Sequence, residues 1–404
     1  MTSLHVTYIL SSYPGLTTTF VDREITILRR MGIDLHVIAL RPPETILSLD
    51  QKEIQKRVTY LAPLGKLSLI KAHLRFLVTH PRRYLSTLLY LVTCPHSSFL
   101  SRRKTVRQFS QGVHAASLLR RTPVNHIHAH FIHAAIVALV VSRLLRVPYS
   151  VTAHASGDIF VKPVMLREKL SGAKFIATCT RYNQEYLNKV GKGVFGDKVK
   201  CIYHGLDVQR YRRKQPLALN GRPVILGVGQ LKERKGFNDL IDACGMIKEL
   251  GLDFECRIIG EGPLRPQLEA RVRQLDLADR VTLMGALAQE EVIDQYERAY
   301  LFALPAVLAR NGDRDGIPNV ILEALAMELP VISTRHSAVP EVIEDGVNGL
   351  LVEPGDSAAL AQALLKLLEN PELGRTLGCR GRQTVVEKFD PEKNAHQLLE
   401  EIIA

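Results

Sequence analysis

Short apolar runs alternate with segments of helical periodicity along almost the whole chain. In the first half, residues 5–10 and 34–40 are strand-like, and residues 19–31 between them have apolar positions at helical spacing. Further strand-like runs follow at residues 124–130, 148–154 and 174–178. Strands that alternate with helices favour parallel α/β units, because the connection between two parallel strands is usually a helix.

A second series of the same kind begins after residues 207–216, a polar stretch typical of a linker. Its strand-like runs are residues 223–228, 254–259, 281–284, 301–304, 330–333 and 349–352. We therefore predict an α/β fold of two Rossmann-like doubly wound domains that face a cleft. The predicted N-terminal domain spans residues 1–210 and contains an insertion at 51–122, and the second domain spans residues 211–385. Residues 386–404 form a C-terminal helix whose packing the pattern leaves open.

The composition fits a soluble globular protein. A chain of 404 residues has room for two cores, and it is 46% hydrophobic and 23% charged. The first residues lack the pattern of a signal peptide, and the longest apolar run, residues 134–141, is far shorter than the roughly 20 residues that span a bilayer. The expected location is therefore the cytoplasm. The six cysteines form no C-x-x-C pair, so neither a structural zinc site nor a disulfide framework is expected.

The excess of positive charge is concentrated in one segment. The formal net charge of the chain is +12, and residues 51–122 contain 14 lysines and arginines against one acidic residue. Between residues 67 and 77, basic side chains interrupt a row of large apolar ones. This mixture is typical of a face that lies on an anionic membrane surface, here the inner face of the cell membrane, but also of an amphipathic helix with a solvated basic side. No nucleic-acid-binding module accompanies the charge, so nucleic acid is not an expected partner.

The strongest candidate site follows the run at 301–304, where a long loop leads into a helix opened by Pro318. Proline is favoured at the start of a helix, and the free N–H groups and the helix dipole there attract a diphosphate. Asp315 precedes this start, and Glu323 lies about a turn and a half into the helix. One carboxylate could bind sugar hydroxyls and the other a ribose diol. Spacing alone leaves a helix cap and a surface charge as the alternative.

Two glycine-containing loops follow the first two strands of the second series. Gly229 and Gln230 begin one loop, and Lys235 near its end is placed to meet a phosphate at a helix N-terminus. Gly260 and Gly262 in the other loop permit close approach of a ligand to the backbone, although an ordinary tight turn uses the same residues. The first loop lacks G-x-G-x-x-G and the chain has no Walker A sequence, which disfavours dinucleotide dehydrogenases and P-loop NTPases.

Histidines gather at strand ends in the first half. His126, His128, His130 and His133 crowd the end of one strand, and His154 ends the next, where its side chain is expected to face the cleft. A metal site needs three or four converging ligands, and the chain offers these histidines neither an H-E-x-x-H sequence nor a cysteine partner. We therefore predict histidines that line the cleft and no bound metal.

Together these segments resemble glycosyltransferase family 4, the retaining enzymes of the GT-B fold, and the likeness covers almost the whole chain. It is carried in the second half by residues 315–326, 330–334 and 346–352. In the first half, the sequences at 12–14, 19–21, 128–131 and 152–154 more narrowly resemble bacterial exopolysaccharide transferases of the colanic acid type.

The resemblance implies a role for each matching residue. It assigns Glu323 to the nucleotide ribose, Asp315 and the backbone after it to the donor sugar, and Lys235 to the diphosphate. His154 would bind the sugar and phosphate from across the cleft. The backbone after the aspartate comprises Gly316, Ile317, Pro318 and Asn319.

Two positions depart from the family pattern. The usual pair of glutamates is here Asp315 and Glu323, so Asp315 reaches one methylene less and the sugar preference could differ. The usual arginine five residues before the lysine is Gln230, which removes one positive charge, and Arg234 is the candidate to replace it.

The implied reaction moves a sugar from a nucleoside-diphosphate sugar to a hydroxyl of a saccharide or lipid-linked acceptor, with retention and without a metal or other cofactor. A lysine and a helix N-terminus would stabilise the charge that builds on the leaving diphosphate. Two alternatives share the architecture: a nucleotide-sugar epimerase or hydrolase, and a non-catalytic nucleotide-sugar-binding partner of an assembly complex. Fold alone does not decide among them.

Overall fold

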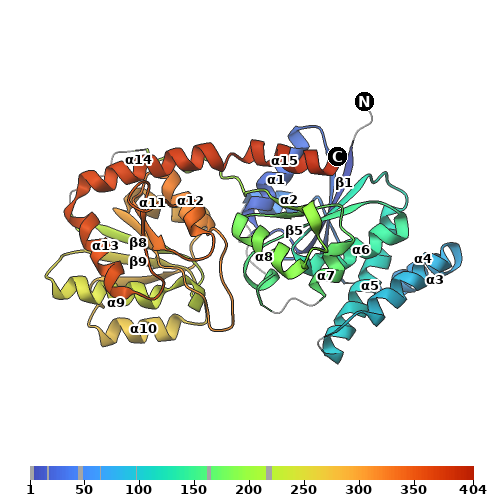
Figure 1. The fold of residues 1–404 in the computed structure, drawn as a ribbon, viewed down its shortest axis with the longest axis horizontal. Coiled ribbons are helices and arrows are strands. Elements are labelled where there is room, and N and C mark those ends of the chain that lie inside the picture. The colour runs from blue at the N-terminus through green and yellow to red at the C-terminus, as the bar shows by residue number, and fades with distance from the viewer. Residues whose placement is uncertain are drawn as a thin grey trace. The chain divides into compact units, whose positions relative to one another are not determined.

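The chain divides into two compact units in the computed structural model: Met1–Gly205 with Pro391–Ala404, and Leu206–Asp390. The structure describes residues 4–15, 18–43, 49–63, 65–96, 98–161, 165–214 and 221–404. Each unit is built on one parallel sheet (Figure 1).

The first unit has a seven-stranded sheet with the order β3-β2-β1-β4-β5-β6-β7. Its strands are β1 (His5–Ser12), β2 (Asp34–Arg41), β3 (Val58–Tyr60), β4 (His126–His130), β5 (Tyr149–Ala153), β6 (Ile176–Thr178) and β7 (Val199–Cys201). The order reverses between β1 and β4, which pair in parallel. In a doubly wound sheet, the crevice at such a reversal lies outside the carboxyl ends of the strands.

Helices form two layers over this sheet because successive side chains of each strand point to opposite faces. Ile9 belongs to a core with α5, α6 and α7, whereas Tyr8 and Leu10 belong to a core with α1 and α15. The helices of the unit are α1 (Thr19–Arg30), α2 (Leu49–Gln55), α3 (Lys66–Thr79), α4 (Pro81–Thr93), α5 (Phe99–Leu119), α6 (Ile132–Leu145), η1 (Ser156–Asp158), α7 (Leu166–Ser171), α8 (Arg181–Gly191), η2 (Gly196–Lys198) and α15 (Pro391–Ile403).

The last helix, whose packing the sequence pattern left open, belongs to the first unit. Ala395, Leu398 and Ile402 are buried in the core with α1. The ammonium of Lys174 donates a hydrogen bond of 2.8 Å to the carbonyl oxygen of Ile402. Figure 1 shows α15 beside α1, so the two ends of the chain share one layer.

The second unit repeats this topology with a six-stranded sheet of order β10-β9-β8-β11-β12-β13. Its strands are β8 (Val224–Val228), β9 (Glu255–Ile259), β10 (Val281–Gly285), β11 (Leu301–Leu304), β12 (Val331–Thr334) and β13 (Leu350–Val352). Its helices are η3 (Glu233–Lys235), α9 (Phe237–Glu249), α10 (Arg265–Gln274), α11 (Gln289–Arg298), α12 (Asn319–Ala326), η4 (Val339–Glu341), α13 (Ser357–Glu369) and α14 (Pro371–Lys388). Here the order reverses between β8 and β11.

The predicted α/β fold with two Rossmann-like sheets is confirmed, and every predicted strand is present. The sequence analysis missed β3 and β7, which lie at the two edges of the first sheet. Each has only three residues, and the side chains of β3 are all half-buried. Such short edge strands carry too little apolar periodicity to be distinguished from loops.

The predicted linker at residues 207–216 is wrong for its described part. Tyr211 is only 1% exposed. The guanidinium of Arg213 donates hydrogen bonds to the carbonyl oxygens of Tyr296, Glu297 and Ala299 at 3.5, 3.1 and 2.7 Å. The polar side chains that suggested a linker therefore fasten this stretch to the second unit. Residues 215 and 216 lie outside the described residues.

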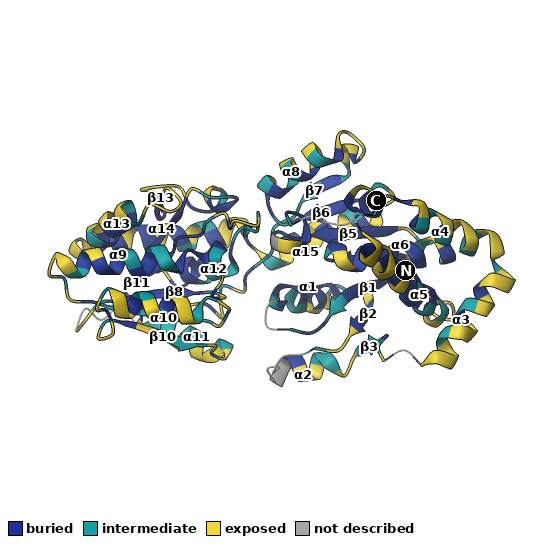
Figure 2. Cartoon of the chain, turned by 90° about the horizontal axis from the view of Figure 1, so that it is seen from below, coloured by how far each residue is buried: buried dark blue, intermediate teal, exposed yellow. Residues whose placement is uncertain are grey.

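The basic segment folds mainly into α3, α4 and α5, of which α3 is the most exposed (Figure 2). Ala72 and Phe76 are the buried residues of α3. Five large apolar side chains of the same helix are 40–77% exposed: Leu67, Ile70, Leu74, Leu77 and Val78. None of the described helices has the length and apolar character needed to cross a membrane.

Candidate functional site

The candidate donor site of the second unit is built where its strand order reverses. β8 leads into the loop and the turn η3 that carry Lys235, and β11 leads into the long loop that carries Asp315. Because β8 and β11 are parallel neighbours, their carboxyl ends lie at the same edge of the sheet. The ammonium nitrogen of Lys235 lies 2.8 Å from Oδ2 of Asp315.

Arg234 joins the same cluster. Its Nε lies 3.0 Å from Oδ1 of Asp315, and its Nη1 lies 2.8 Å from Oδ2 of Asp313. Its Nη2 donates a hydrogen bond of 3.2 Å to the side-chain oxygen of Gln230. The guanidinium therefore stands beside the position where the family pattern has its arginine. Two cations and two carboxylates, 9–17% exposed, make the cluster formally neutral without a ligand.

The neighbouring opposite charges keep Asp315 and Arg234 ionised. Burial raises the pKa of Asp315, but the nearby charges of Lys235 and Arg234 outweigh burial and hold the pKa below its usual value. Burial lowers the pKa of Arg234, and the carboxylates of Asp315 and Asp313 outweigh it in the opposite direction. At neutral pH the site thus contains an ionised carboxylate that is held by two cations.

The glycines predicted to bind the donor allow their two loops to pack closely against each other. A Cβ atom on Gly260 would lie 1.9 Å from the carbonyl oxygen of Gly229, and one on Gly262 would lie 2.5 Å from that of Leu231. A Cβ atom on Gly229 would approach the Cδ of Lys235 to 3.2 Å. Close packing therefore accounts for these three glycines without a ligand, and their predicted role in donor binding stays a prediction.

The residues after Asp315 lead into α12. Gly316 and Pro318 are buried, whereas Ile317 and Asn319 are half-buried. Pro318 is the N-cap of α12, and Asn319 is its first helical residue. The helix thus starts one residue later than predicted, with Pro318 at its N-cap and not at its first helical position.

Glu323 lies in the middle of α12 and is half-buried. The hydroxyl of Tyr296 donates a hydrogen bond of 3.1 Å to Oε2 of Glu323. Burial, followed by the charge of Glu323, raises the pKa of Tyr296 well above its usual value, so the tyrosine stays a donor. The carboxylate of Glu323 is therefore oriented by a buried phenol, which makes a plain surface charge the poorer explanation.

In the first unit, a chain of hydrogen-bonded side chains runs from Glu24 through three histidines. Oε1 of Glu24 lies 3.1 Å from Nε2 of His130 and accepts a hydrogen bond of 2.6 Å from the hydroxyl of Tyr8. Nδ1 of His130 lies 3.4 Å from Nε2 of His154, whose Nδ1 lies 3.2 Å from Nε2 of His204. With neutral rings, the ionised Glu24 makes each Nε2 the donor and each Nδ1 the acceptor.

Burial keeps most of these histidines neutral. It lowers the pKa of His154 well below the usual value, and the neighbouring histidines lower the pKa further. Burial likewise lowers the pKa of His204 and of His126 to about 3 each. Burial is the largest single influence on the pKa of Glu24 and raises it, but His130, Tyr8 and His204 together outweigh burial, so that the net pKa is lowered. His154 is thus a neutral ring held in one orientation by Glu24 and His130.

The remaining histidines of β4 are explained by the sheet itself. Both ring nitrogens of His128 hydrogen-bond hydroxyls of β5, with Nδ1 2.7 Å from Ser150 and Nε2 2.8 Å from Thr152. Nε2 of His126 lies 2.7 Å from the same serine oxygen. These two histidines are buried within the sheet and do not line a cleft, so that part of the prediction is wrong. His133, at the start of α6, lies 3.4 Å from Oδ1 of Asp158.

Two groups in the first unit could offer three metal ligands within 4.8 Å: His154, Cys179 and His204, and Glu24, His128 and His130. The expectation that no cysteine accompanies the histidines is therefore wrong, because the sheet brings Cys179 beside His154. The ring nitrogens of His154 and His130 are already engaged in hydrogen bonds. Hydrogen bonding therefore explains why the side chains of both groups lie close together. The absence of a bound metal stays a prediction.

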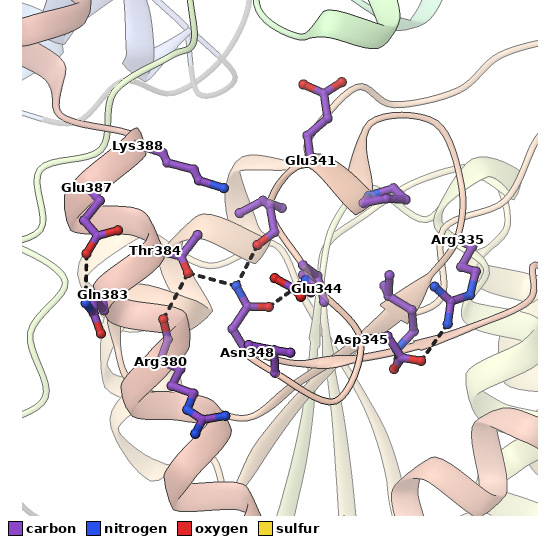
Figure 3. A pocket seen from close by; sticks show the side chains of 15 residues that line it. Arg335, Glu341, Glu344, Asp345, Asn348, Arg380, Gln383, Thr384, Glu387 and Lys388 are labelled. Atoms are coloured by element: carbon purple, nitrogen blue, oxygen red, sulfur yellow. Dashed lines mark hydrogen bonds and ion pairs between the residues drawn. The ribbon is translucent and has the colours of Figure 1, made fainter.

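Figure 3 shows a polar pocket of about 600 Å³ in the second unit. It is lined by α14 and the segment before β13, and it contains none of the predicted site residues. Asn348 braces this region. Its amide donates hydrogen bonds of 2.9 Å to the carbonyl of Val342 and to the hydroxyl of Thr384, and its oxygen accepts one of 2.8 Å from the N–H of Glu344. Asn348, which lies in the family-like segment 346–352, thus has a structural role.

The sequence analysis missed several residues of these clusters. Asp313 lies two positions before Asp315 in an irregular loop, where neither period nor spacing marks it. Glu24 lies on the amphipathic helix α1, where an acidic residue is usually a surface charge. His204 follows the missed strand β7. Only a correct prediction of β7 would have placed His204 beside the strand ends that carry His130 and His154.

Two family models match the chain. The model of the Glycosyl transferases group 1 matches residues 208–384, and that of Glycosyltransferase Family 4 matches residues 17–210. The chain belongs to the family 4 glycosyltransferases. The predicted family and enzyme class are therefore confirmed for this glycosyltransferase.

This glycosyltransferase is similar to the amylovoran biosynthesis glycosyltransferase AmsK of Erwinia amylovora, with 29% identity over 410 residues that cover 98% of each chain. It is also similar to the colanic acid biosynthesis glycosyltransferase WcaL of Escherichia coli K12, with 35% identity over 199 residues, 48% of each chain.

Solved structures agree with the fold of this glycosyltransferase. A glycosyltransferase from Rickettsia africae ESF-5 aligns with a TM-score of 0.72 at 15% identity and covers 100% of this chain and 98% of its own. The Anabaena protein HepE, in complex with UDP-glucose, aligns with a TM-score of 0.72 at 18% identity over 98% of each chain. The predicted GT-B fold class is therefore confirmed.

Proposed function

We propose that this glycosyltransferase moves a sugar, with retention, from a nucleoside-diphosphate sugar to a hydroxyl of a saccharide or lipid-linked acceptor in polysaccharide biosynthesis. The similar proteins AmsK and WcaL are named for the synthesis of amylovoran and of colanic acid, which supports the pathway. The complex of HepE with UDP-glucose supports a nucleoside-diphosphate sugar as the donor.

The observation that carries the proposal is the contact between Lys235 and Asp315 where the order of the second sheet reverses. A diphosphate that binds Lys235 would free the carboxylate of Asp315 to accept hydrogen bonds from the hydroxyls of the donor sugar. The N-terminus of α12, which follows Pro318, adds partial positive charge. Lys235 and this helix end then stabilise the diphosphate as negative charge develops on it.

In the proposed reaction, the bond between the anomeric carbon and the diphosphate oxygen breaks, and the acceptor oxygen bonds to the anomeric carbon on the same face. The proton of the acceptor hydroxyl passes to an oxygen of the leaving diphosphate, so the reaction needs no nucleophilic side chain. Glu323 holds the ribose, with its carboxylate oriented by Tyr296. His154 binds the sugar and phosphate, with its ring oriented by His130.

The proposal includes attachment to an anionic membrane through α3. At about 100° per residue, the exposed stripe that contains Leu67, Ile70 and Leu74 lies on the side opposite to the buried pair Ala72 and Phe76. Lys66, Lys71 and Arg75 fall along the edges of this stripe. An outward apolar stripe with basic borders fits a lipid surface better than a solvated basic face. The exposure of leucine side chains to water is unfavourable, whereas a lipid surface would bury them.

A two-step experiment tests the proposal. A thermal-shift screen of UDP-, GDP- and ADP-sugars should identify one nucleotide that raises the unfolding temperature. With that donor labelled in the sugar, the label should move to a membrane-lipid or saccharide acceptor with its anomeric configuration retained. An epimerase would return a changed nucleotide sugar, a hydrolase would release free sugar, and a binding partner would leave the donor intact. Any of these results would contradict the proposal.

A further inference from the structure

A second cavity, of about 200 Å³, lies in the first unit between α5, α6 and α7. Its polar lining comes from four elements. α5 contributes Ser101, Lys104 and Gln108, and α7 contributes Lys169. The start of α6 and the turn η1 complete the wall with His133 and Asp158. Neither the donor cluster nor the histidine chain described above includes the two lysines.

Lys169 is the unusual member of this wall. It is only 5% exposed, and no hydrogen bond or ion pair links its ammonium to a described residue. Burial lowers its pKa to about 8, partly offset by the charge of Asp158. The hydroxyl of Ser101 in the same wall is also buried, without a partner among the described residues. A buried ammonium that faces a cavity is normally compensated by an anion.

Asp158, the carboxylate in the same wall, partly offsets this charge from a distance, but no ion pair links it to Lys169 among the described residues. Its Oδ1 accepts a hydrogen bond of 2.7 Å from the N–H of Ile132, and its Oδ2 accepts one of 2.9 Å from the N–H of His154. The carboxylate thus fastens the ends of β4 and β5 to each other. Because Asp158 also lines the cavity, its hydrogen bond joins the cavity wall directly to His154, the histidine predicted to face the donor.

The first turn of α5, which leads into the lining residues of the cavity, is apolar and basic. Phe99 and Leu100, at the start of α5, are 75% and 72% exposed, and Leu100 lies one turn before Lys104. Arg102 and Arg103 on the same turn are exposed. A phosphate held by the two lysines would therefore lie next to side chains suited to a lipid chain and to anionic headgroups.

We propose that this cavity binds the phosphate of an amphiphilic, phosphate-bearing lipid acceptor. The inference rests on the proposed transfer to a lipid-linked acceptor, and it assigns Lys169 and Lys104 to the phosphate. Leu100, one turn before Lys104, contacts the lipid chain. The N–H of His154, through Asp158, connects this subsite to the strand end where the sugar is transferred.

Binding of farnesyl diphosphate, farnesol and inorganic diphosphate, measured by calorimetry, tests this assignment. The full chain is first saturated with the nucleoside diphosphate that it binds, so that the donor site is occupied. Farnesyl diphosphate should bind at least ten-fold more tightly than inorganic diphosphate, and farnesol should not bind. Lys169→Met should weaken the binding of farnesyl diphosphate at least ten-fold. Lys104→Ala should weaken this binding about three- to ten-fold, because Lys104 is exposed.

Arg107→Ala is the matched control, because Arg107 is an exposed basic residue on α5 outside the cavity lining. It should change the affinity less than two-fold, and all three variants should bind the nucleoside diphosphate like the unchanged protein. Unchanged farnesyl diphosphate binding in Lys104→Ala and Lys169→Met would overturn the assignment. Equal affinity for inorganic diphosphate and for farnesyl diphosphate would overturn the assignment of a lipid ligand. Failure of nucleotide binding in the unchanged protein would instead contradict the proposed donor site.

Discussion

The ammonium of Lys235 and the carboxylate of Asp315 lie 2.8 Å apart, although the two residues are 80 positions apart in the chain. They meet because β8 and β11 are parallel neighbours at the reversal of the second sheet. Without a ligand, Asp315 neutralises the lysine and also binds Arg234. A donor diphosphate must therefore compete with a carboxylate of the protein for the same cation.

This competition predicts opposite effects on binding and on transfer. Asp315→Asn removes one negative charge beside Lys235 and Arg234, so the affinity for the nucleoside diphosphate alone should rise about three- to ten-fold. Sugar transfer should fall at least 100-fold, because a strong acceptor for the sugar hydroxyls is lost, a typical magnitude for a group that stabilises the transition state. Calorimetry and a labelled-donor assay measure the two effects.

Asp313→Asn is the matched control for this prediction. Asp313 forms an ion pair of 2.8 Å with Arg234, whereas the ion pair of Lys235 is with Asp315. Its replacement should also raise nucleotide affinity and should leave transfer within about three-fold. Equal losses of transfer in both variants would contradict a specific role for Asp315 in binding the sugar.

The membrane proposal predicts that the outward stripe of α3 inserts into lipid. The double variant Leu67→Gln, Leu74→Gln should weaken binding to vesicles with 30% anionic lipid at least ten-fold, because each buried leucine contributes about 1.5–3 kcal/mol. The unfolding temperature should not fall, since both side chains are 66% and 56% exposed. Binding should also decrease with salt, as expected for charges on a surface.

The corresponding control is Leu250→Gln in the second unit, where the leucine is 65% exposed. This variant should bind vesicles like the unchanged protein. Vesicle binding that is insensitive to both the α3 substitutions and the salt concentration would show that α3 is a solvated helix.

The buried histidines predict a loss of stability in acid. The pKa values of His126, His128, His154 and His204 are lowered by burial, so the unfolded chain takes up protons below pH 6.5 that the folded chain does not. The free energy of unfolding should therefore fall as the pH decreases through 6.5, by about 1.4 kcal/mol per histidine between pH 7.5 and 5.5. Urea unfolding between pH 7.5 and 5.0 measures this slope, and a flat profile would contradict neutral buried histidines.

The brace made by Asn348 predicts a stability defect without a specific loss of donor binding. Asn348→Ala leaves the carbonyl of Val342 and the N–H of Glu344 without their side-chain partner, which should cost about 1–3 kcal/mol in the free energy of unfolding. Gln383→Ala on neighbouring α14 is the control, because Gln383 pairs with Glu387 at the surface and should change stability by less than about 0.5 kcal/mol. A stable Asn348→Ala variant that cannot bind nucleotide would contradict the structural role.

The sequence predicted the sheets well because many of their strands are buried on both faces and appear as apolar runs, as β8 and β11 do in the middle of the second sheet. It missed β3 and β7 because three-residue edge strands lack that signal. Asp315, Lys235 and Arg234 were identified one by one, but their contact depends on the order of the strands, which no local pattern contains. For the same reason no local pattern indicates that Cys179 lies beside His154.

Transfer of a labelled sugar from the selected nucleotide donor to a membrane-lipid extract tests whether Lys235 stabilises the leaving diphosphate. Lys235→Ala should lower the rate of transfer at least 100-fold. Lys232→Ala, an exposed lysine three positions earlier in the same loop, should keep the rate within two-fold. A Lys235→Ala variant that transfers sugar at more than half the rate of the unchanged protein would contradict the account.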